Sequence, residues 1–142
     1  MRIYLCAIFA PSGSRDFTFA EIPETEAESI LETAVSSISN LLLDTPSSAH
    51  LGLIHRSVSI QLYGYVSCTG WIVILGLEHG PFDSADISRA FIDKVYSSVV
   101  DSASNPFFSS LRESSAFNSQ FKNYLESHCA MMKFMATAGV VG

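Results

Sequence analysis

Residues 51–78 read LGLIHRSVSIQLYGYVSCTGWIVILGLE, and this stretch decides the fold. From Val58 to Val66, aliphatic residues and Gly64 alternate with Ser, Gln and Tyr, and a period of two is typical of a strand. Gly70 then allows the positive φ of a tight turn. The following WIVILGL run is apolar on both faces, which indicates a central strand covered on both sides. We therefore predict a hairpin in the middle of a sheet.

The segments before this stretch predict two strands and a helix. The strands are expected at residues 2–10 and 16–22, joined by the turn-rich PSGSR at 11–15. Thr25 followed by Glu28 is typical of a capping box at a helix start. Apolar residues then recur at helical spacing and form a single stripe. The stripe contains Ala27, Ile30, Leu31, Ala34, Ile38, Leu41 and Leu42.

Two helices are predicted after the hairpin, from about Ser84 to Ala103 and from residues 110–115 to about Phe134. The element order is then ββαβββαα, a mostly antiparallel five-stranded sheet between helices, of the mixed α/β (α+β) class. The first helix has one apolar stripe and covers one face, so the other two helices take the other face. We expect a single core that includes Leu62, Trp71, Ile74, Phe91 and Val95.

Length and composition limit the function classes. The chain has 142 residues, 48% of them apolar and 15% charged, which fits one domain over 1–135 with a frayed tail at 136–142. The net charge of −6 argues against a nucleic-acid partner. No apolar run is long enough for a transmembrane segment. Three widely spaced cysteines, Cys6, Cys68 and Cys129, favour reduced thiols in a cytoplasmic protein.

Motifs for chemistry are missing from the sequence. It contains no GxSxG elbow, no His/Cys spacing suited to a metal, and no glycine-rich phosphate loop. We therefore predict no catalytic residue, no metal ligand and no cofactor. A small hydrolase stays open as an alternative, because a pocket formed by distant residues leaves no motif.

Two surface features remain as candidates. The loop Asn105-Pro106-Phe107-Phe108 contains Asn-Pro-Phe, a known adaptor ligand when exposed, but two adjacent exposed phenylalanines are unfavourable, so we predict a structural loop anchor. The first helix carries small polar residues outside its stripe, which lose little entropy and hydration when a partner covers them. The predicted partner surface is Glu32, Ser36, Ser39 and Asn40; a plain solvated face is the alternative.

Five segments in order resemble the sedlin group, the small longin-like subunits of the TRAPP vesicle-tethering complexes. They are Leu51–Ile54, Leu62–Val66, Trp71–Leu77, Asn105–Phe108 and Ser114–Phe117. The resemblance is closest to the sedlin-like paralogue. It is good from residue 51 to about 121 and loose over 1–44. The family tends to carry acidic residues where this chain has Ser36 and Ser39, so contacts made by those acids do not transfer.

The resemblance implies a longin/SNARE-like ββαβββαα sandwich and a non-catalytic adaptor. Its implied partners are other TRAPP subunits, small or core ones and a large one, and indirectly a Rab GTPase whose nucleotide exchange the whole complex promotes. Its implied place is the cytoplasm, peripherally on Golgi or ER–Golgi membranes. A longin domain of another trafficking protein, either a SNARE or a small adaptor-coat chain, is the alternative; a longin SNARE is expected to continue into heptads and a membrane anchor.

Overall fold

The computed structural model describes residues 3–41, 49–56, 60–67, 69–78, 85–106, 108 and 110–141, with the backbone alone at 39–41, 49–52, 55, 85–87 and 129–141. The elements follow the predicted ββαβββαα order. They are β1 (Ile3–Phe9), β2 (Arg15–Ala20), α1 (Glu24–Leu41), β3 (Ala49–Arg56), β4 (Ile60–Val66), β5 (Ile72–Glu78), α2 (Ala85–Ala103) and α3 (Ser115–Val141). Helix α3 includes residues 136–141, which the sequence predicted to fray.

The five strands form one sheet in the order β2-β1-β5-β4-β3, and every neighbouring pair is antiparallel. Strand β5 is therefore the central strand, as its run of apolar residues predicted. Gly70 has φ +98° in the turn before β5. Val58, Ser59 and Cys68 of the predicted hairpin lie outside the described residues.

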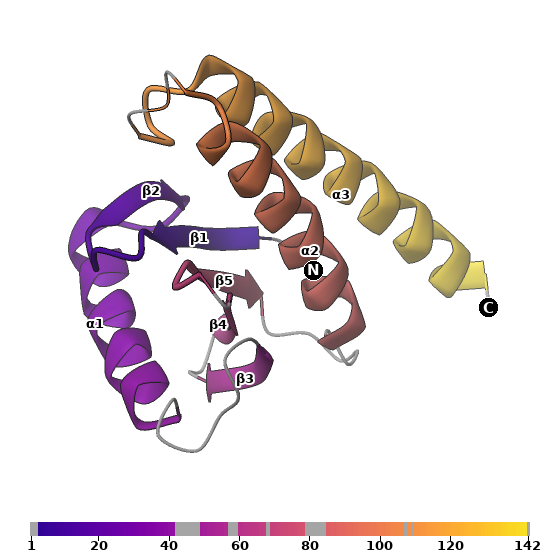
Figure 1. The fold of residues 1–142 in the computed structure, drawn as a ribbon. Coiled ribbons are helices and arrows are strands. Elements are labelled where there is room, and N and C mark those ends of the chain that lie inside the picture. Colours follow the sequence, from indigo (N-terminus) through magenta and orange to yellow (C-terminus); the bar gives the residue numbers. More distant parts are fainter. Residues whose placement is uncertain are drawn as a thin grey trace.

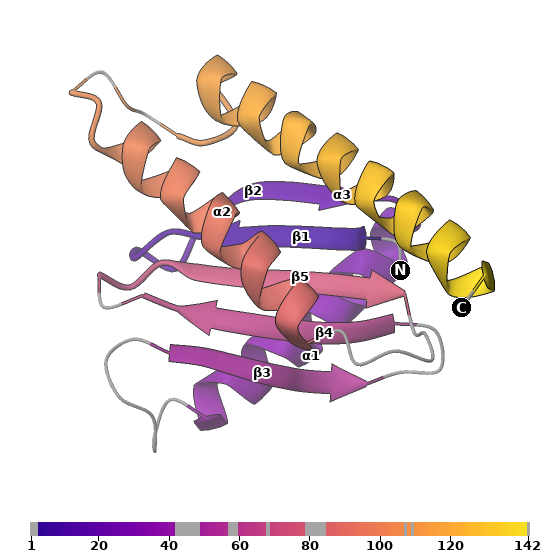
Figure 2. The same cartoon turned by 90° about the vertical axis from the view of Figure 1, so that its right-hand side faces the viewer.

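The sheet separates two helical layers. Helix α1 lies against one face, and α2 and α3 lie against the other (Figure 1). Turned by 90°, the view shows α2 and α3 crossing in front of the strands with α1 behind them (Figure 2). The predicted arrangement of one helix against two is confirmed.

The expectation of a single core is wrong, because the sheet divides the apolar residues into two clusters. Phe91 and Val95 are buried on the α2/α3 side, with Trp71 packed against them. Leu62 and Ile74 are buried on the α1 side. Successive residues of a strand point to opposite faces, so the alternation that predicted the strands also separates these residues.

The start of α1 differs from the predicted capping pattern, and α3 has an N-cap that the sequence analysis did not predict. Helix α1 begins at Glu24, so Thr25 lies inside its first turn and not at the cap. The Glu28 carboxylate forms an ion pair with Arg15 at the start of β2. At α3, the Phe117 N–H donates to Ser114 Oγ at 3.2 Å, which is the hydrogen bond of an N-cap serine.

A β-bulge shapes the centre of the sheet. The pairing of β1 with β5 shifts between Ile3 and Leu5, so Tyr4 and Leu5 together face Gly76. A Cβ atom added to Gly76 would lie 3.0 Å from Leu5 Cβ. Because Leu5 approaches so closely, a side chain at this position would require its neighbours to shift, which is consistent with a glycine in an otherwise aliphatic strand.

Candidate functional site

The outer face of α1 is the surface that the sequence predicted for a partner. Ala27, Leu31, Ala34 and Ile38 are buried against the sheet. Glu32 and Ser36 are exposed on the opposite side, while the side chains of Ser39 and Asn40 lie outside the description. The helix contains no basic residue. Among the described side chains the outer face therefore combines acidic and small polar groups.

A hollow lies beside Glu32 and Ser36, where α1 passes the end of β1. Its apolar lining is Phe9, Leu31 and Val35. Val35 is 40% exposed, which is high for a residue of its kind on a helix that covers a sheet. The remaining lining residues are polar or charged, namely Arg15, Glu28, Glu32 and Ser36. Apolar and polar side chains thus meet in this hollow, a combination found in partner-binding surfaces.

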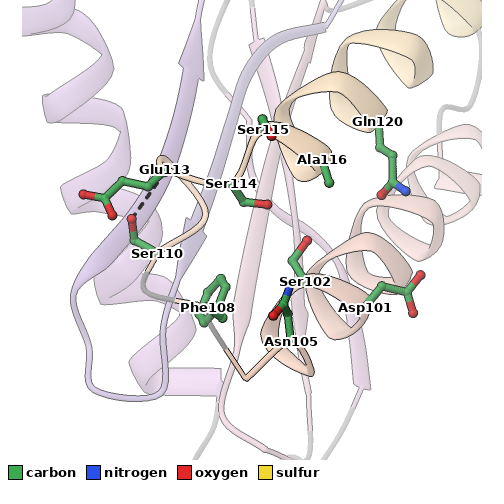
Figure 3. A pocket seen from close by; sticks show the side chains of 10 residues that line it. All are labelled: Asp101, Ser102, Asn105, Phe108, Ser110, Glu113, Ser114, Ser115, Ala116 and Gln120. Atoms are coloured by element: carbon green, nitrogen blue, oxygen red, sulfur yellow. Dashed lines mark hydrogen bonds between the residues drawn. The ribbon is translucent and has the colours of Figure 1, made fainter.

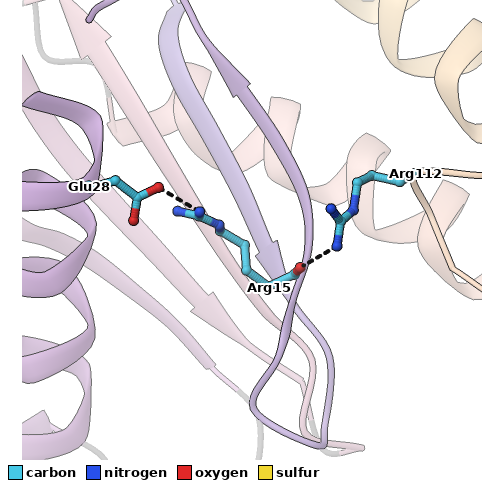
Figure 4. Close-up of polar contacts among 3 residues, drawn as sticks. All are labelled: Arg15, Glu28 and Arg112. Atoms are coloured by element: carbon cyan, nitrogen blue, oxygen red, sulfur yellow. Dashed lines mark hydrogen bonds and ion pairs between the residues drawn. The ribbon is translucent and has the colours of Figure 1, made fainter. Parts of the chain in front are cut away.

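Polar contacts link both helical layers to the start of β2. The guanidinium group of Arg15 pairs with the Glu28 carboxylate on α1, and Arg112 Nη2 donates to the Arg15 carbonyl oxygen at 3.4 Å (Figure 4). Both side chains of the ion pair are partly solvated, so the pair stabilises the fold weakly. The contacts place two basic side chains at one end of the β2 edge.

A second hollow, of about 320 Å³, lies where α2 connects to α3. Side chains from the end of α2, the connection and the first two turns of α3 surround it (Figure 3). Asn105 and Pro106 are exposed. Phe108 is half-buried against the α2/α3-side core. Phe107, the third residue of the Asn-Pro-Phe segment, lies outside the described residues.

Hydrogen bonds hold the end of this connection. The Leu111 N–H donates to Asp16 Oδ2 at 3.0 Å, and Leu111 itself is fully buried. Asn118 Nδ2 donates to the carbonyl oxygens of Leu111, Arg112 and Ser114. The connection is therefore fixed both to β2 and to the first turn of α3, which keeps Arg112 at the β2 edge.

Within the ranges given above, no group of three His, Cys, Asp or Glu side chains is placed to hold a metal ion. Burial raises the pKa of the Cys6 thiol to about 12, so this cysteine stays a neutral core residue. No helix in the described part of the chain is long and apolar enough to cross a membrane. His128 is buried between α2 and α3, with its ring 5.9 Å from that of Phe91.

Two features of the surface were absent from the sequence prediction. Val35 stands outside the apolar stripe of its helix, and an apolar residue in that position was a usable signal for exposure. The contacts of Arg15 with Glu28 and Arg112 join residues from three separate segments. No local pattern marks such a contact, so only the fold shows it.

Comparisons with known proteins identify one family. A family model described as Sedlin matches residues 13–127, which is more than half of the chain. The matched range extends from the turn before β2 into α3, and includes the outer face of α1, the hollow at the α2–α3 connection, and every residue that lines the hollow beside α1 except Phe9. A search among curated proteins found no match.

Proposed function

The chain belongs to the sedlin family of TRAPP-type trafficking subunits, and on this premise we propose that it is a non-catalytic adaptor subunit of a TRAPP vesicle-tethering complex. The match over residues 13–127 is the observation that carries the proposal. In this role the protein acts in ER–Golgi or intra-Golgi transport. It contributes to nucleotide exchange on a Rab GTPase as a member of the whole complex and not by its own chemistry.

An adaptor works by presenting surfaces, and we assign the outer face of α1 to this task. Glu32 and Ser36 are exposed there, beside the apolar hollow at Val35. Ser39 and Asn40 extend the proposed surface by one further turn of the helix. Small polar side chains around an apolar centre lose little hydration on association, while the buried apolar contact supplies the favourable free energy.

We assign a structural role to Asn105, Pro106, Phe107 and Phe108. The packing of Phe108 against the core supports an anchor for the α2–α3 connection. The Phe108 N–H also donates to the Asn105 carbonyl oxygen at 2.9 Å, which closes a turn over this segment. In the proposed adaptor the segment supports the fold and does not act as a free adaptor ligand.

The outer face is tested with Ser36→Arg, which places a long charged side chain at the edge of the Val35 hollow. Ser119→Arg is the matched control, because Ser119 is also an exposed serine within a helix. Each tagged variant is purified from cells and the co-purifying proteins are identified by mass spectrometry. We expect Ser36→Arg to reduce the recovery of TRAPP subunits at least about tenfold, as disruption of a buried contact does. Ser119→Arg should leave recovery unchanged.

Two results would contradict these assignments separately. If wild-type protein recovers no TRAPP subunit, the adaptor function is wrong. If wild-type protein and Ser36→Arg recover the same subunits in equal amounts, the function stands but the interface lies away from α1. Thermal melts of both variants check that exposed substitutions leave the fold intact, as is usual for such sites.

A further inference from the structure

The two edges of the sheet differ in regularity. Strand β3 shifts its pairing register with β4 at two places, between His50 and Gly52 and between Leu53 and His55. Strand β2 has a single shift opposite Ile8 and Phe9, at its start, and is regular from Phe17 to Ala20. Bulges on an edge strand hinder pairing with another chain. The β2 edge is therefore the one whose geometry suits an additional strand.

The backbone of β2 turns its hydrogen-bonding groups away from β1 at two residues. The Glu21 N–H donates to the Tyr4 carbonyl oxygen at 2.8 Å, in register with the β1–β2 pairs. In an antiparallel pair alternate residues bond to the partner strand, so Phe19 faces β1 while Thr18 and Ala20 turn their N–H and C=O groups outward. The side chains of Thr18 and Ala20 are small, neutral and exposed.

The β2 edge carries opposite charges at its two ends. Arg112 lies at its start, held at the Arg15 carbonyl oxygen. Glu24 lies at its far end and is exposed, with no partner among the described residues. Arg112 and Glu24 line one hollow together with Thr18 and Ala20. A strand that pairs antiparallel with β2 therefore needs an acidic group near Arg112 and a basic group near Glu24. The β2 edge of a second copy, running in the opposite direction, places its own Glu24 and Arg112 at these two positions.

We propose that β2 of one copy pairs with β2 of a second copy, antiparallel and about a two-fold axis at Phe19. In this register Thr18 faces Ala20 of the other copy and Ala20 faces its Thr18. Each of these pairs exchanges two backbone hydrogen bonds, and the irregular start of β2 stays outside the pairing. The two-fold axis also sets Arg112 of each copy toward Glu24 of the other.

Phe19 sits on the axis of the proposed dimer. It is half-buried, with its ring 5.6 Å from that of Phe121 on α3. Facing residues in a non-hydrogen-bonded antiparallel pair bring their side chains closest, and aromatic pairs stabilise such positions. Pairing therefore covers the exposed part of both Phe19 rings and satisfies the outward backbone groups of both edges.

The two-fold axis is perpendicular to the joined sheet, so the α1 helices of both copies lie on the same face of that sheet. The contact is self-complementary and closed, which limits assembly to two copies. Pairing of the isolated chain with a second copy does not depend on the trafficking role. In the proposed dimer the two α1 outer faces lie on the same face of the joined sheet.

Sedimentation velocity of the full chain, from about 1 μM to about 1 mM, measures the monomer–dimer equilibrium. Ala20→Pro removes an outward N–H, and proline is tolerated at such positions of an edge strand. Ala20→Ser keeps the N–H and is the matched control. We expect Ala20→Pro to weaken dimerisation at least about tenfold and Ala20→Ser to leave it unchanged, as expected for the loss of backbone hydrogen bonds.

A charge exchange tests the same contact without a backbone change. Glu24→Arg and Arg112→Glu are each expected to weaken the dimer, and the double variant is expected to restore it because both ends are exchanged. A wild-type chain that stays monomeric over the whole range overturns the proposal. So does a dimer that folded Ala20→Pro leaves intact, or one whose double variant is as weak as either single variant. Recovery of TRAPP subunits plays no part in these outcomes.

Discussion

The two faces of the sheet are covered in different ways. On the α1 side, alanines and aliphatic residues fill the space, including Ala7, Ala27 and Ala34. On the α2/α3 side, aromatic rings dominate. They include Phe17, Phe91, Phe117 and Phe121, with Tyr63 of β4 among them. Small residues bring one helix close to the strands, while large rings hold two helices against the other face.

The difference explains how each layer is stabilised. Phe17 on β2 makes edge-to-face contacts with Phe117 and Phe121 at ring separations of 5.0 and 4.9 Å, so the ring cluster connects α3 to the edge of the sheet. The α1 side depends on close fit, since Gly76 gives Leu5 its space. Loss of volume should therefore be costly on the aromatic side, and gain of volume on the α1 side.

The largest effect is expected from Phe117→Ala. Phe117 on α3 is fully buried with its ring 5.0 Å from that of Phe17 on β2, and its replacement leaves a cavity in the α2/α3-side core. Substitutions of this kind cost about 3–5 kcal/mol of unfolding free energy. Urea unfolding followed by circular dichroism measures the loss, with Ser119→Ala as the exposed control on the same helix. A loss under about 1 kcal/mol would show that α3 is a loosely attached layer.

The sequence predicted the layers better than their contacts. The alternation in 60–66 and the stripe of α1 depend on local spacing, so periodicity was sufficient to place Leu62 and Ile38 in cores. The bulge at Tyr4 depends on which strands become neighbours, and no local pattern encodes that. The prediction of a single core was wrong for the same reason, because Ile74 and Phe91 are both apolar yet lie on opposite faces of the sheet.

For the candidate surface, too, the sequence predicted local features but not contacts between distant segments. Helical spacing alone places Glu32 and Ser36 away from the buried stripe, and both are exposed. The hollow beside them is lined in part by Phe9 from β1, and the basic end of the β2 edge is formed in part by Arg112 from the α2–α3 connection. These residues come together only when the sheet order is known, so the sequence identified the helix face but not its surroundings.

A smaller effect is expected from Gly76→Ala on the α1 side. The added methyl group would lie 3.0 Å from Leu5 Cβ and 3.3 Å from Leu62 Cδ2, so neighbouring side chains must move. Overpacking in a close-fitting core costs about 1–3 kcal/mol. Gly64→Ala is the matched control, because its nearest neighbours are the Ile54 methyl groups at 3.4 Å. Urea unfolding should show a clear loss for Gly76→Ala and little change for Gly64→Ala.

Equal stabilities of these two variants would contradict the close fit at Gly76. Neither glycine has a positive φ, so backbone strain does not distinguish the two sites. Replacement of glycine also restricts the unfolded chain, which favours both variants by similar amounts. The difference between them therefore measures the space beside Leu5 alone.

The smallest effect is expected where the two layers are bridged at the edge of the sheet. Arg15 pairs with Glu28 of α1, and its side chain is 33% exposed while that of Glu28 is 46% exposed. Water and salt screen such a pair, so a double-mutant cycle with Arg15→Met and Glu28→Gln should give a coupling energy under about 1 kcal/mol. Repeating the cycle at about 1 M salt should abolish most of it, since the screening length is then only about 3 Å.

A coupling energy well above that limit, unchanged by salt, would mean that the Arg15–Glu28 pair is shielded from water and fixes α1 to the β1–β2 hairpin. The two faces would then be mechanically joined at the β2 edge. A small, salt-sensitive coupling instead means that each layer is stabilised by its own packing against the sheet. Glu28 and Glu24, which has no partner among the described residues, would then remain responsive to a partner's charges, which is what charge-dependent pairing at the β2 edge requires.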